Sequence, residues 1–132
     1  MCMSCIVLIV DDAEQCAETL EVALFGLPGV DVMAAESAEA ALRMMLTRDD
    51  ARRICAVITD LNLPRMSGFD LIRRVREQPG YAHVPILVIS GDSDPGTPER
   101  IRALGADAFF PKPYSPSAVR KKLETLLDAI PS

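Results

Sequence analysis

The sequence has no apolar run near the roughly 20 residues that a helix needs to span a bilayer. Its first apolar stretch, residues 6–10, is short, has no basic residues before it and stops at two aspartates. It therefore does not read as a signal peptide. These absences predict a cytoplasmic protein without a membrane partner.

Positive charge is also scarce. The 14 basic residues are outnumbered by 19 acidic ones, and the net charge of −5 argues against nucleic acid as a direct partner. At 132 residues the chain has room for one domain with one core.

Cysteine and histidine are too few for a disulfide framework or an obvious zinc site. Cys2 and Cys5 have CxxC spacing, but no second CxxC follows and the chain has a single histidine. We expect this pair to precede and enter the first strand, and any role for it stays open. Cys16 and Cys55 are predicted to be small core residues.

Polar residues follow four short apolar runs that read as buried parallel strands. The runs are residues 6–10, 56–59, 86–89 and 108–111, and they lead into Asp11-Asp12, Asp60, Ser90-Gly91 and Lys112-Pro113. Because parallel strands end at the same edge of a sheet, we expect these polar side chains to converge there.

Helical patterns alternate with the strands. Capping signals at Ser37, Ser67, Thr97-Pro98 and Ser115-Pro116 predict helix starts, and residues 30–34 predict a further strand. The sequence thus predicts an α/β fold: a single doubly wound (βα)5 domain with a flavodoxin-like parallel five-stranded sheet in the order 2-1-3-4-5.

That strand order makes Asp11, Asp12 and Asp60 neighbours. Three adjacent carboxylates repel one another, and a bound Mg²⁺, for which Mn²⁺ could substitute, would relieve the repulsion. Asp60 stands alone at its strand end and is the better candidate nucleophile, whereas Asp11 and Asp12 read as metal ligands. Lys112 and Ser90 could bind phosphoryl oxygens.

With these motifs the chain resembles the receiver domain of two-component response regulators. The resemblance covers about residues 5–130 and lies in Asp11-Asp12, the segment DLNLPRMSG at 60–68, Ser90-Gly91 and Lys112-Pro113. It implies one receiver domain over residues 1–132 with no output domain in this chain.

The resemblance also implies the metal ligands. Asp60 would be the phosphoacceptor, Asp12 would ligate Mg²⁺ directly, and Asp11 would do so mostly through water. Asn62 would offer its backbone carbonyl.

The same resemblance assigns the residues that pass the signal on. Ser90 would be the switch hydroxyl, and Lys112 would pair with the acceptor and then with the phosphoryl group. The Lys112–Pro113 peptide bond is expected to be cis. Phe109 occupies the switch-aromatic position, although a plain core role for it stays open, and alternation places Phe110 on the opposite face of the strand.

The implied function is a phosphorylation-dependent signalling switch that accepts a phosphoryl group from a histidine kinase or histidine phosphotransfer protein. It would catalyse its own phosphorylation and dephosphorylation without turning over an external substrate. The downstream effector is unknown, and the chain would be a monomer or a phosphorylation-dependent homodimer.

The remaining basic residues and the histidine are expected at the surface. Arg73, Arg74 and Arg76 read as a solvated helix face, and His83 reads as a loop residue rather than a phosphohistidine. Residues 120–122 read the same way, or as part of a dimer or partner contact.

Other classes of function stay open. A haloacid-dehalogenase-like phosphatase would use similar parts, but it needs an acid two residues after the nucleophile, where this chain has Asn62. A non-phosphorylated binding module on the same fold is the other alternative. A flavin-binding protein is disfavoured because Asp11 and Asp12 would repel the phosphate of the flavin.

Overall fold

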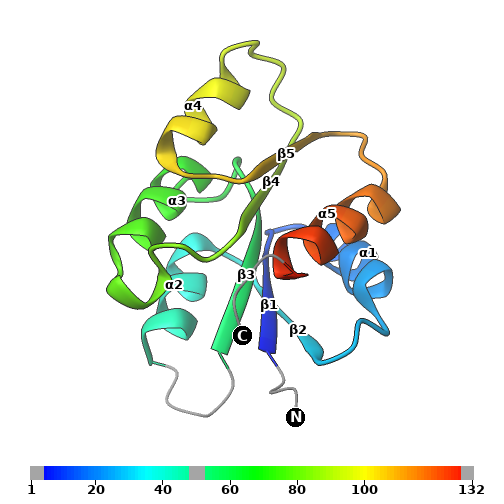
Figure 1. The fold of residues 1–132 in the computed structure, drawn as a ribbon. Helices are drawn as coiled ribbons and strands as arrows, with labels where there is room; N and C mark the ends of the chain where they lie inside the picture. The colour runs from blue at the N-terminus through cyan, green and yellow to red at the C-terminus, as the bar shows by residue number, and fades with distance from the viewer. Residues whose placement is uncertain (1–4, 48–52, 129–132) are drawn as a thin grey trace.

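The computed structural model describes residues 5–47 and 53–128, and a five-stranded parallel sheet forms its centre (Figure 1). The strands are β1 (Cys5–Val10), β2 (Val30–Ala35), β3 (Arg53–Asp60), β4 (Ile86–Ser90) and β5 (Ala108–Pro111). The helices are α1 (Glu14–Leu24), α2 (Ala38–Thr47), α3 (Gly68–Glu77), α4 (Thr97–Leu104) and α5 (Pro116–Asp128), with a 3₁₀ turn at Pro79–Tyr81.

The strand order is β2-β1-β3-β4-β5, which confirms the predicted topology. In this order β1 and β3 lie side by side, and the connections from β1 and from β3 leave in opposite directions across the sheet. A doubly wound sheet binds ligands at such a point, outside the carboxyl ends of the strands.

Helices cover both faces of the sheet, so the central strands β1, β3 and β4 are buried on two sides (Figure 1). In β1, Ile6, Leu8 and Val10 pack towards the side of α2, α3 and α4. Val7 and Ile9 pack towards α1 and α5. This two-sided burial explains why the strands read as continuous apolar runs rather than as alternating patterns.

The predicted caps agree with the structure at three helix starts. Ser37 Oγ accepts from the Ala40 N–H at 3.1 Å, Ser67 Oγ from Asp70 at 3.2 Å and Ser115 Oγ from Ala118 at 3.3 Å. At α4 the prediction is wrong by one residue. Gly96 is the N-cap, and Thr97 is the first residue of the helix. The Thr97 hydroxyl does not cap α4 but donates to Asp92 Oδ2 at 3.1 Å.

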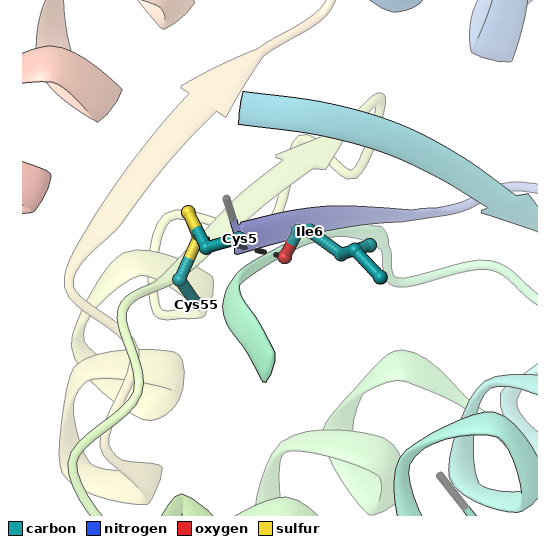
Figure 2. The surroundings of a disulfide bond; sticks show 3 residues. All are labelled: Cys5, Ile6 and Cys55. Atoms are coloured by element: carbon teal, nitrogen blue, oxygen red, sulfur yellow. Dashed lines mark hydrogen bonds between the residues drawn. A yellow bond between two sulfur atoms is a disulfide. The ribbon is translucent and has the colours of Figure 1, made fainter. Parts of the chain in front are cut away.

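The prediction for Cys55 also needs correction. The register of β1 and β3 shifts between Ile6 and Val7, where Ile6 pairs with Ile54 and Val7 pairs with Ala56. Cys55 is the extra residue of this β-bulge, and it forms a disulfide with Cys5 (Figure 2).

The chain has two further cysteines, Cys2 and Cys16. Cys16 is a half-buried free thiol. Cys2, the other half of the CxxC spacing, lies outside the described residues, as does most of the charged turn that precedes β3. Within residues 5–47 and 53–128, no helix has the length and hydrophobicity that a transmembrane segment requires.

Candidate functional site

Asp60, the last residue of β3, lies at the centre of the polar cluster. Its carboxyl group is buried and has a donor at each oxygen. Lys112 Nζ, just after β5, donates to Oδ2 at 2.7 Å, and the Asn62 N–H donates to Oδ1 at 2.9 Å. The sheet thus brings together two side chains that are 52 positions apart in the sequence.

Asp11 lies beside Asp60 at the edge of the sheet. Val10 pairs with Thr59, so the residues that follow them, Asp11 and Asp60, stand at the same level on adjacent strands. Burial raises the pKa of Asp11, a hydrogen bond from the Ala13 N–H at 2.8 Å lowers it, and the charge of Asp60 raises it. The pKa is raised overall, so the site disfavours negative charge on Asp11.

The carboxylates of Asp60 and Asp11 both raise the pKa of the Lys112 ammonium group. Partial burial lowers its pKa, but the hydrogen bond and charge of Asp60, together with the charge of Asp11, outweigh that effect and raise it. Lys112 therefore remains charged and is the positive group of the site.

Asp12 is placed differently from its neighbour. It is exposed, although its charge adds to the rise in the pKa of Asp11. Within the described part of the chain, no three His, Cys, Asp or Glu side chains are grouped to hold a metal ion. The structure thus brings Asp11 and Asp60 together and leaves the third expected ligand at the surface.

The chemistry of the site nevertheless fits a divalent cation. Asp11 is a buried carboxylate beside a second one, and its raised pKa has the repulsion between them among its causes. Mg²⁺ prefers oxygen ligands and retains several waters, so it does not require a complete cage of protein side chains.

Ser90 ends β4 and is fully buried beside β3. Asp60 pairs with Ile89, which places Ser90 one position beyond the end of β3. Its Oγ accepts from the Asp92 N–H at 3.0 Å, and its carbonyl accepts from the Lys112 N–H at 2.9 Å. The hydroxyl and the lysine are therefore fixed in the same stretch of the sheet edge.

Gly91 and the turn after β5 shape the same edge. A Cβ built on Gly91 would lie 4.0 Å from Lys112 Cδ, so a large side chain there would approach the lysine. The Lys112–Pro113 peptide bond is cis.

The two phenylalanines of β5 lie on opposite faces, as alternation predicts. Phe109 packs against the core under α2, α3 and α4, and Phe110 packs on the side of α1 and α5. Phe109 also lines a pocket of about 290 Å³ together with Pro98 and Ile101 of α4. A change in the position of the Phe109 ring would therefore alter its packing against α4.

A contact between two helices lies next to this region. The guanidinium of Arg100 on α4 stacks over the ring of Phe69 on α3, 4.0 Å from its centroid. Such cation–π pairs contribute about 0.5–1 kcal/mol at exposed sites.

Arg76 is not part of a solvated face, and the prediction for it is wrong. Its guanidinium donates to the carbonyls of Gly105, Tyr81 and Val84 and to Asp107 Oδ2. It joins α3 to the end of α4 and the start of β5. Its spacing of four from the buried Ile72 was a signal that it shares the inner helix face.

Arg120 likewise differs from its exposed neighbours Lys121 and Lys122. It donates to the carbonyls of Ala23 and Phe25, each at 2.8 Å, and so holds α5 against the end of α1. Arg73, Arg74 and His83 are exposed, as predicted.

Comparison with known proteins agrees with the predicted receiver-domain fold. Residues 7–124 match the family model described as the response regulator receiver domain. The chain is 31% identical over 122 residues to a chemotaxis protein CheY homolog of Campylobacter jejuni, covering 91% of this chain and 90% of that protein. It is 32% identical over 122 residues to chemotaxis protein CheY1 of Helicobacter pylori, covering 91% and 94%.

A solved structure shows the same likeness in three dimensions. The crystal structure of a putative response regulator from Chloroflexus aurantiacus superposes with a TM-score of 0.83 at 31% identity, covering 95% of this chain and 98% of that one. The chain therefore belongs to the response regulator receiver domain family, the phosphorylation-dependent signalling switches of two-component systems.

Proposed function

We propose that Asp60 is the residue that accepts the phosphoryl group. An oxygen of its carboxylate attacks phosphorus on a phosphohistidine, the P–N bond breaks, and the ring nitrogen leaves with the electron pair. The donor is a histidine kinase or a histidine phosphotransfer protein. The observation that carries this proposal is the buried Asp60 carboxylate held 2.7 Å from the Lys112 ammonium.

The proposed metal is Mg²⁺, with Mn²⁺ as a possible substitute. Asp11, Asp12, Asp60 and the backbone carbonyl of Asn62 would hold it. When bound, it supplies positive charge to the phosphoryl oxygens. The raised pKa of Asp11 supports this assignment, because a cation would offset the repulsion that contributes to it.

Lys112 and Ser90 have separate proposed roles. Lys112 releases part of its interaction with Asp60 and binds a phosphoryl oxygen, which neutralises charge in the transition state. The hydroxyl of Ser90 then donates to another phosphoryl oxygen. The same groups let the domain use small phosphodonors and hydrolyse its own aspartyl phosphate, without turnover of an external substrate.

The signal passes from Ser90 to the surface around α4. When Ser90 moves towards the phosphoryl group, space opens behind it and Phe109 turns inward. The pocket that Phe109 shares with Pro98 and Ile101 supports this route. Because Phe109 has no hydroxyl, the transmitted change comes from ring packing alone.

The partners downstream follow from the same surface. An effector, or a second copy of the phosphorylated chain, would bind the changed face around α4, and this exchange would take place in the cytoplasm. A haloacid-dehalogenase-like phosphatase is not favoured, because Asn62 stands where that class needs a proton donor.

Titration with beryllofluoride and Mg²⁺, followed by amide NMR, tests the proposal. We expect shifts at Asp60, Ser90, Phe109 and along α4, and none of these in Asp60→Asn. A flat response in the native chain, or an equal response in the variant, would overturn the assignment and favour a binding module that is not phosphorylated.

A further inference from the structure

The amino-terminal edge of the sheet holds a disulfide, at the ends of β1 and β3 opposite to those where Asp11 and Asp60 lie. Cys5 begins β1 and Cys55 lies near the beginning of β3, and the two sulfurs are bonded (Figure 2). Their Cα atoms are 5.7 Å apart, within the usual range for a disulfide. The two cysteines are 50 positions apart in the sequence.

A backbone irregularity brings the two side chains together. Cys5 pairs with Arg53 and Ile6 with Ile54, but Val7 pairs with Ala56, which leaves Cys55 as an extra residue in β3. Cys55 and Ala56 both pack on the side of α1 and α5, although consecutive strand residues normally face opposite ways. Cys5 and Val7 share that face by alternation, so the bulge turns Cys55 towards Cys5.

The surroundings suit the reduced pair as well as the oxidised one. The Ile6 carbonyl oxygen lies 3.5 Å from Cys55 Sγ, where it can accept a hydrogen bond from the thiol (Figure 2). Both cysteines are only partly buried, so a small reagent can approach the sulfurs.

We propose that Cys5 and Cys55 form a thiol–disulfide exchange site that low-molecular-weight disulfides oxidise and low-molecular-weight thiols reduce. A thiolate of the pair attacks a sulfur of the small disulfide, forms a mixed disulfide and releases one small thiolate. The second protein thiolate then attacks the mixed disulfide and releases the other. The two cysteines lose two electrons and two protons, and the small disulfide gains them as two thiols.

The crosslink changes stability without entering the phosphorylation site. It closes a loop of 50 residues in the unfolded chain, which restricts the unfolded state more than a short loop would. Asp60 lies at the other end of β3, beyond Ala56, Val57 and Ile58, which are fully or almost fully buried. Oxidation therefore stabilises the folded chain and leaves the surroundings of Asp60 unchanged.

The test equilibrates the full-length chain in mixtures of reduced and oxidised glutathione. Free thiols are then alkylated, and the linked peptides are identified by mass spectrometry. We expect a peptide that joins Cys5 to Cys55 in oxidising mixtures and its loss in reducing ones. Reduction should lower the Tm of the native chain by about 10 °C.

Matched variants separate this pair from the other cysteines. Cys2→Ser and Cys16→Ser should keep both the linked peptide and the drop in Tm. Cys5→Ser and Cys55→Ser should melt near the reduced native chain and show no drop on reduction. If either variant fails to fold, reduction of the native chain gives the same comparison.

Three results would overturn the proposal. Cys5 and Cys55 could remain alkylatable in oxidised glutathione, the linked peptide could join Cys2 to Cys5 instead, or the drop in Tm could persist in Cys55→Ser. The beryllofluoride response should be equal in oxidised and reduced chains. A failure of redox exchange is thus distinguishable from a failure of the phosphorylation site.

Discussion

Replacing Arg76 with alanine removes five hydrogen bonds that join α3 to the end of α4, to the segment between the 3₁₀ turn and β4, and to the residue before β5. The guanidinium serves the carbonyls of Gly105, Tyr81 and Val84, with the shortest distances 2.6 Å and 2.7 Å, and it also binds Asp107. Each lost bond to a partly buried carbonyl contributes about 1 kcal/mol. Three such carbonyls imply a loss of about 3 kcal/mol in the free energy of unfolding.

The assay is urea denaturation followed by circular dichroism, with thermal melting as a second measure. A loss of about 3 kcal/mol corresponds to a fall in Tm of about 10 °C for a chain of this size. Arg73→Ala is the matched control, because Arg73 is exposed on the same helix and, among residues 5–47 and 53–128, pairs only with Asp70, at 3.0 Å. We expect that control to change stability by less than about 0.5 kcal/mol.

The reasoning would be refuted if Arg76→Ala were as stable as Arg73→Ala. It would also fail if Arg76→Lys restored full stability, because a lysine cannot reproduce the planar fork that reaches several carbonyls at once.

Three further perturbations test the site and its frame. In Gly68→Ala the new Cβ would clash with the carbonyl oxygen of Asp60 and would lie 2.7 Å from Leu61 Cα, and we expect a loss of about 1–3 kcal/mol in urea denaturation. In Gly80→Ala the new Cβ would meet no atom within 4 Å among the described residues other than its chain neighbours, and stability should stay within about 0.5 kcal/mol. The raised pKa of Asp11 means that the folded state binds the proton more tightly than the unfolded state does, so this group lowers stability as pH rises from its ordinary pKa of 3.8 through the raised value. Asp11→Asn should therefore be more stable than the native chain at pH 7, and the difference should shrink towards pH 4; a constant difference would contradict this. Lys112→Met should slow phosphorylation from a small phosphodonor by about 100-fold, measured by phosphoprotein electrophoresis, whereas the exposed Lys122→Met should leave the rate unchanged.

Apolar runs and the polar residues that end them carry most of the information about the fold. A parallel strand buried on both faces must be apolar throughout, so β1 and β4 are visible in the sequence, and Asp60 and Ser90 mark where strands end. Capping residues predicted the starts of α2 and α3 because a cap lies within a few residues of the helix that it caps.

Contacts between residues far apart in the sequence could not be predicted from hydrophobic patterns and local motifs. A β-bulge is invisible to a rule based on alternation, so the pairing of Cys55 with Cys5 could not be predicted. The partners of Arg76 lie up to 31 positions away, and a basic residue within a basic run looks solvated until the α4–β5 turn is placed against it. The exposed position of Asp12 beside the buried Asp11 also depends on local geometry that the Asp-Asp pair itself does not reveal.

Identification of the phosphorylated residue tests the central assignment most directly. The full chain is incubated with acetyl phosphate and Mg²⁺, the aspartyl phosphate is reduced with borohydride to homoserine, and the site is found by peptide mass spectrometry. We predict homoserine at position 60 alone, with none in Asp60→Asn or when Mg²⁺ is chelated. Modification at another carboxylate of the native chain, or undiminished labelling of Asp60→Asn, would contradict the account.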